Sequence, residues 1–267
     1  MLKKLLKYDM REMLRKSYPL YILSGALALL CCGMLFFVKA FEASGEYMVG
    51  VSASMSFYGF GLLGIFALLI MSLYAPLVRY YKSFFSREGY LYMVIPQKMS
   101  TLLLAKLIST AIWAIISILV ATLAFLLAVA APNLLYDPRG FEATVGMVLD
   151  RVSALGAELT VPSVIVALIH GIITVAEVSS VMFLAITLGS MLFRRRRSLG
   201  VVLFYLLLTA VKSLLLGAVE TLLLLSLGAG PLLYLLDIIA ATTVTLISAA
   251  AAFFITLHLL KTRYNLA

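Results

Sequence analysis

Six long stretches of the chain consist largely of apolar residues, without the strict alternation of polar and apolar positions that marks a barrel strand. They are residues Tyr18–Ala40, Val49–Val78, Thr101–Ala131, Pro162–Phe193, Leu199–Gly217 and Leu233–Leu260. A helix rises about 1.5 Å per residue and the apolar core of a bilayer is about 30 Å thick, so about 20 such residues cross it. The pattern predicts an all-α integral membrane protein with six transmembrane helices in a single domain over residues 18–267.

Composition supports this class. Of the 267 residues, 64% are apolar or aromatic and 12% are charged, whereas soluble domains are about 45–50% apolar and about 25% charged. Such a chain has too little polar surface to face water on all sides. A soluble enzyme, a disordered chain and a fibrous repeat are therefore excluded.

The distribution of positive charge predicts the orientation of the spans. Seventeen lysines and arginines fall at the N-terminus, after the second and fourth spans and at the C-terminus, whereas three fall on the opposite side. Basic loops stay cytoplasmic, so both termini are expected inside the cell. The run Arg194–Arg197 fits a topology anchor that touches anionic lipid better than a nucleic-acid site, and no nucleic-acid partner is expected.

Residues 1–17 have the pattern of an amphipathic interfacial helix. Apolar side chains recur at steps of three and four, and basic side chains take the opposite face. The segment is either a simple membrane anchor or a helix that contacts a cytoplasmic partner. Asp9 falls inside the apolar arc, which favours a protein contact over lipid.

The loop over residues 79–100 has the signals of a short cytoplasmic helix. Ser86 can cap its start, Glu88 lies in its first turn, where the helix dipole favours an acid, and Pro96 ends it. An interfacial aromatic belt would explain the tyrosines of this loop but not the order of cap, acid, glycine and proline.

The run Ser86-Arg87-Glu88-Gly89-Tyr90-Leu91, followed by Ile95-Pro96 and by Lys106 at the foot of the third span, resembles the corresponding loop of ABC-2-type transporter permeases of Gram-positive bacteria. The resemblance implies a coupling helix over Phe85–Met93 that docks on a separate ATP-binding subunit. Its site residues would be Phe85, Ser86, Arg87, Glu88, Gly89, Tyr90 and Leu91. It also implies a bacterial cytoplasmic membrane and a dimer with a second permease copy or a homologue.

Two segments are expected on the outer side. The loop over residues 132–161 carries apolar residues at helical spacing, which predicts a helix resting on the outer surface. Residues 213–232 are apolar but contain Glu220 and end in a Gly- and Pro-rich break. They are too short for two more full spans, so an outer re-entrant hairpin is expected, as the family resemblance also implies.

Several polar residues lie inside the predicted spans. His170, Thr174 and Glu177 share one face of the fourth span, and Lys212 lies at a matching depth in the fifth. We expect Glu177 to pair with Lys212. The alternatives are a polar face that lines a pathway and a proton relay through His170 and Glu177.

The sequence contains no phosphate-binding loop motif and no paired Cys/His pattern that would supply a metal site. The chain is therefore expected to have no catalytic residues, no metal and no cofactor of its own, with ATP and Mg on the partner subunit. The expected function is the permease subunit of an ABC exporter that moves amphipathic substrates outward: a peptide, a lipid-like molecule or a hydrophobic drug. An ion-coupled secondary transporter and a non-transporting membrane scaffold remain alternatives.

Overall fold

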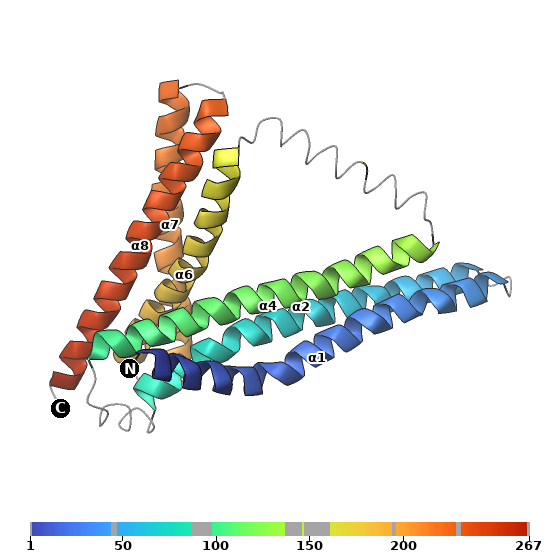
Figure 1. Cartoon of the computed structure of the whole chain (residues 1–267), viewed down its shortest axis with the longest axis horizontal. Coiled ribbons are helices and arrows are strands. Elements are labelled where there is room, and N and C mark those ends of the chain that lie inside the picture. The colour runs from blue at the N-terminus through green and yellow to red at the C-terminus, as the bar shows by residue number, and fades with distance from the viewer. Residues whose placement is uncertain are drawn as a thin grey trace. The chain divides into compact units, whose positions relative to one another are not determined.

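The computed structural model of the chain describes residues 2–43, 47–86, 98–136, 146, 161–193, 196–227 and 231–265, and all of these except residues 86, 98, 193 and 196 are helical. Figure 1 shows these helices, and they keep its labels below. The predicted all-α fold class is confirmed for these residues.

The first three helices are longer than the spans predicted from the sequence. They are α1 (Leu2–Ala43), α2 (Tyr47–Phe85) and α4 (Met99–Tyr136). The amphipathic segment and the first span, expected as separate elements, form one helix with Pro19 inside it. Residues 79–85, assigned to a loop because of their charge, are the last two turns of α2. The connection between α2 and α4 is therefore shorter than residues 79–100.

The remaining three helices are α6 (Val161–Leu192), α7 (Arg197–Leu227) and α8 (Pro231–Asn265). All three pairs among them are in contact, and Figure 1 shows the three helices running alongside one another. Within the predicted re-entrant region, residues 213–232, residues 213–227 continue α7 without a break and residues 231–232 begin α8. Residues 228–230 lie outside the described residues, as does most of the segment predicted as the outer loop, residues 132–161.

Five helices of the described part are long and apolar enough to cross a membrane. Their apolar segments are Gly59–Phe85, Met99–Ala128, Leu168–Leu192, Arg197–Leu223 and Leu236–Thr262. This is the pattern of a multi-pass helical membrane protein. The predicted first span lies in α1, where the side chains of residues 34–43 are outside the described part, so a sixth span stays a prediction.

The chain divides into two compact units. The first unit holds residues 1–9, 77–111 and 156–267, and the second holds residues 10–76 and 112–155. The core of the first unit is built on the end of α2 and the start of α4, packed against α6 and the end of α8. Its buried members are Tyr80, Phe84, Phe85, Leu102, Leu103, Phe183, Ile186 and Leu260.

Small residues let the helices of the second unit approach closely. Its core contains Ala28, Ala124 and Ala128. A methyl group added at Gly61 would overlap the Cys31 Sγ. Close approach at small residues is how apolar helices gain contact without the hydrophobic effect that drives packing in water.

Candidate functional site

The first unit contains an ion pair that links three helices. The Lys212 Nζ lies 2.9 Å from the Glu177 Oε2, and the Ser248 hydroxyl donates to the Glu177 Oε1 over 3.0 Å. The Glu177 side chain is 4% exposed and the Lys212 side chain 20% exposed. α6 therefore contributes a buried acid that is bonded to α7 and α8 together. The predicted pairing of Glu177 with Lys212 is confirmed.

His170 lies two turns from Glu177 on α6 and has its own partners. The His170 Nδ1 lies 3.0 Å from the Thr242 Oγ1 of α8, and the His170 Nε2 lies 3.4 Å from the Thr174 Oγ1. Thr174 also donates to the His170 carbonyl over 2.8 Å. The four residues predicted as polar groups of the spans thus all make contacts within the α6–α7–α8 bundle.

A second buried cluster holds the start of α1. The Asp9 Oδ1 accepts from the Arg79 Nη2 over 2.5 Å and from the Lys106 Nζ over 2.9 Å, and Arg79 also donates to the Asp9 carbonyl. All three side chains are 6–7% exposed. Charge-assisted bonds of this kind are about twice as strong as neutral ones. Asp9 therefore makes the protein contact that its position in the apolar arc indicated, and the contact is within the same chain.

Tyr80 connects the end of α2 to α6. Its ring stacks on Phe183 with centroids 3.9 Å apart and planes 5° apart, and its hydroxyl lies 2.9 Å from the Thr187 Oγ1. Tyr80 is fully buried, and Phe84 beside it is 2% exposed. The last turns of α2 are therefore held by α6 and by Asp9 of α1, and Asp9 in turn binds Lys106 of α4.

The residues predicted to couple the chain to an ATPase fall at the end of this anchored segment. Phe85 is buried and stacks on Tyr81 with centroids 5.9 Å apart. The Ser86 hydroxyl donates to the Lys82 carbonyl over 2.6 Å, so it bonds back to α2. Residues 87–91 of the predicted coupling helix lie outside the described residues.

The helices α6 and α7 approach each other closely next to the basic run that connects them. A methyl group added at Gly189 would lie 2.6 Å from the Val201 backbone nitrogen, which shows how closely the two helices approach. The Arg197 Nη1 donates to the Tyr81 hydroxyl over 2.7 Å. This bond connects the first residue of α7 to the last turns of α2.

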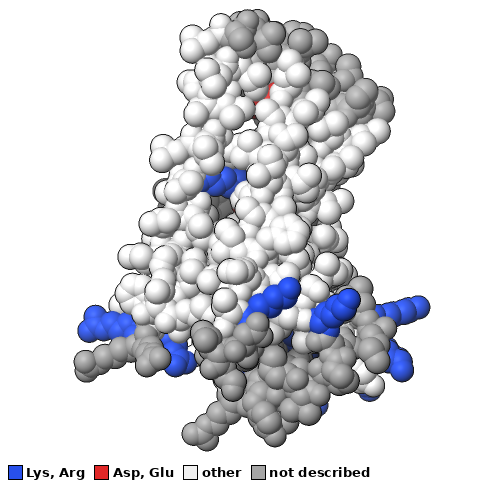
Figure 2. All heavy atoms as spheres, turned by 90° about the vertical axis from the view of Figure 1, so that its left-hand side faces the viewer, with Lys and Arg blue, Asp and Glu red and all other residues white. Residues whose placement is uncertain are grey.

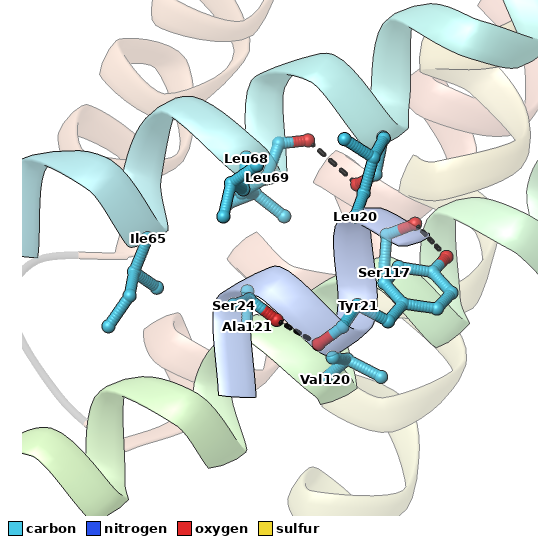
Figure 3. Close-up of a pocket in the computed structure, with 10 residues that line it drawn as sticks. Leu20, Tyr21, Ser24, Ile65, Leu68, Leu69, Ser117, Val120 and Ala121 are labelled. Atoms are coloured by element: carbon cyan, nitrogen blue, oxygen red, sulfur yellow. Dashed lines mark hydrogen bonds between the residues drawn. The ribbon is translucent and has the colours of Figure 1, made fainter. Parts of the chain in front are cut away.

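A small pocket lies in the second unit, and Figure 3 shows its lining. Its walls are Leu20, Tyr21, Ser24, Ile65, Leu68, Leu69, Ser72, Ser117, Val120 and Ala121. The Ser24 and Ser72 hydroxyls donate to backbone carbonyls, and the Tyr21 hydroxyl lies 2.8 Å from the Ser117 Oγ. The lining holds no titratable acid, base or thiol apart from the tyrosine, so the pocket suits an apolar group and offers no acid–base chemistry. In the described part of the chain no group of three metal-ligating side chains occurs.

Sequence reasoning missed the partners in these clusters. From the sequence, Arg79 and Lys106 count as loop charges that set orientation, and no sequence signal marks Ser248 or Thr242. The usable signal was Asp9, an acid on an apolar helix face that needs a buried cation. Comparison with family models, curated proteins and solved structures gave no significant match.

Proposed function

We propose that the chain is the membrane-spanning permease subunit of an ATP-driven exporter, and that a separate ATPase docks under the segment that follows α2. The substrate class that suits apolar spans with few charges is amphipathic: a peptide, a lipid-like molecule or a hydrophobic drug. The proposal rests on the resemblance of residues 86–106 to ABC-2-type permeases. It is supported by how the end of α2 is anchored.

The carrying observation is that the last two turns of α2 are fixed to three other helices of the first unit. Arg79 bonds to Asp9 of α1, and the same carboxylate binds Lys106 of α4. Tyr80 stacks on Phe183 of α6. A solvated loop that only connects two spans does not need such anchorage. A segment that receives force from a partner does, because force applied to an unanchored end would be lost in local bending.

The end of α2 is also connected, through α6, to the polar cluster around Glu177. α6 carries both Phe183, which contacts Tyr80, and Glu177, which bonds to α7 and α8. Tightly packed contacts transmit displacement because protein interiors deform little. A push on the end of α2 would thus reach all helices of the first unit through α6.

The decisive experiment is co-expression with the ATPase encoded nearest to the gene, followed by purification through a tag on this chain. We expect the ATPase to copurify and to hydrolyse ATP. The double variant Glu88→Ala with Gly89→Pro alters the predicted coupling helix and is expected to release the ATPase or to uncouple hydrolysis from transport. The matched control changes an acid and a glycine on the exposed face of α7, Glu220→Ala with Gly217→Ala, and is expected to keep both.

A stable, folded chain that retains no nucleotide-binding partner would overturn the proposal. Transport driven by a pH gradient in vesicles without any ATPase, abolished by Glu177→Gln, would favour an ion-coupled secondary transporter instead. Partner binding without movement of any substrate would favour a membrane scaffold.

A further inference from the structure

We propose that the α6–α7 turn and the last turns of α2 form a binding site for the phosphate headgroup of an anionic phospholipid, with Arg197 and Tyr81 as its contacts. The proposal concerns the lipid around the protein and does not depend on the export function proposed above.

The polar part of this site is a fixed pair of hydrogen-bond donors. The bond from Arg197 to the Tyr81 hydroxyl uses one of the five N–H donors of the guanidinium, and Arg197 is exposed. The Tyr81 hydroxyl accepts this bond and still has its own proton to donate. Tyr81 is itself held by its stacking on Phe85. Two donors held about one hydrogen bond apart suit two oxygens of one phosphate group.

The apolar part of the site is formed by exposed residues close to Arg197 in the sequence. Leu192 at the end of α6 is 64% exposed, Phe193 directly after it is 39% exposed, and Leu199 in the first turn of α7 is 56% exposed. Exposed apolar side chains within two to five residues of an exposed arginine match the boundary between acyl chains and headgroups. An acidic soluble protein would fit the arginine but would leave these side chains in water.

Charge at this end of the first unit is unbalanced. Its exposed cations among the described side chains include Lys3, Lys4, Lys7, Lys82, Lys98, Arg196, Arg197 and Lys261. Of the two acids described in the first turns of α1, Asp9 is buried and bonded to Arg79 and Lys106, and Glu12 is paired with Lys16. Figure 2 shows lysine and arginine gathered at one end, below a surface that is otherwise mostly white. A bilayer with anionic lipid supplies negative charge that complements this excess of cations.

The test uses the purified full chain in nanodiscs of phosphatidylcholine with increasing fractions of phosphatidylglycerol, with thermal unfolding as the readout. We expect phosphatidylglycerol to raise the Tm with a saturable midpoint. Arg197→Gln should move that midpoint to an about fivefold higher lipid fraction, which corresponds to about 1 kcal/mol for one interfacial cation. Tyr81→Phe should cause a smaller shift, and Arg197→Lys should restore part of the effect.

The matched control is Lys98→Gln, which removes one exposed positive charge from the same end of the unit. It should leave the midpoint within twofold of the original. Equal midpoint shifts for Lys98→Gln and Arg197→Gln would show that the lipid acts only by general charge attraction, and would overturn the proposal of a specific site. A Tm that does not respond to phosphatidylglycerol would also overturn it. So would full stabilisation by inorganic phosphate alone in detergent, because the ligand would then not be a lipid.

Discussion

Glu177 and Lys212 form an ion pair between two neighbouring apolar helices, with the acid almost fully buried and the ammonium group at the edge of the bundle. The two partners are unequal. Glu177 also accepts from Ser248 and its side chain is 4% exposed, whereas the longer Lys212 side chain is one-fifth exposed and can extend toward a polar boundary. This asymmetry makes the consequences of removing either partner different.

Lys212→Met should be the more damaging single substitution. It leaves the Glu177 carboxylate buried with only the Ser248 hydroxyl, and breaking a buried pair from one side costs about 3–5 kcal/mol. Glu177→Gln leaves a lysine that can reorient, so its loss should be smaller. The measurement is the free energy of unfolding in mixed micelles for both variants and for the double variant.

The double variant gives the control for this prediction. Because neither charge remains, it should be more stable than the sum of the two single losses implies, and the difference measures the coupling between the side chains. Purely additive losses, or two single variants with unchanged unfolding, would contradict a structural role for the pair.

Asp9→Asn should loosen the N-terminal part of α1. The substitution leaves Arg79 and Lys106 buried without their shared carboxylate, at an expected cost of about 3–5 kcal/mol. Amide hydrogen exchange should rise most in residues 2–8, because the first turns of α1 lose the ion pairs that attach them to α2 and α4. Glu12→Gln is the control on the same helix, since its pair with Lys16 is about half exposed and worth at most about 1 kcal/mol. Similar exchange in both variants would contradict the anchoring role of Asp9.

Gly189→Ala should destabilise the α6–α7 turn. The added methyl group would meet the backbone of Val201 at 2.6 Å, and a backbone cannot move aside as a flexible side chain can. The expected loss is about 1–3 kcal/mol, as for other overpacked sites. Gly171→Ala provides a matched control on the same helix, because nothing lies within 4 Å of the methyl position there. Thermal unfolding of the two variants in the same detergent compares them, and equal Tm values would contradict the close approach.

Tyr80→Phe separates the ring contact from the hydrogen bond. The ring can still stack on Phe183, so the loss should be about 1 kcal/mol, the usual value for one hydrogen bond. Tyr80→Ala removes the stacked ring as well and should cost about 3–5 kcal/mol. If transport and hydrolysis by the complex are established, Tyr80→Ala should also lower transport per ATP hydrolysed. Equal unfolding energies for the two variants would show that the ring contact contributes little.

The apolar stretches were enough to predict helices and their order, because a span needs only length and composition. The pair Glu177–Lys212 was also within reach, since helix rise converts residue number into depth and two opposite charges at one depth inside apolar spans need each other. Both the spans and the ion pair could be predicted from positions along the chain alone.

What only the tertiary structure decided is which residues meet at the ends of the helices. Arg79 and Lys106 had the appearance of loop charges, and they are buried around Asp9, about 70 and 97 residues away along the chain. The continuity of α1 through Pro19 and of α7 through residue 227 also depended on the fold. Helix ends are fixed by long-range contacts that compete with local signals, because a buried ion pair or a stacked ring outweighs the small free energy by which a cap or a charge favours one boundary over another.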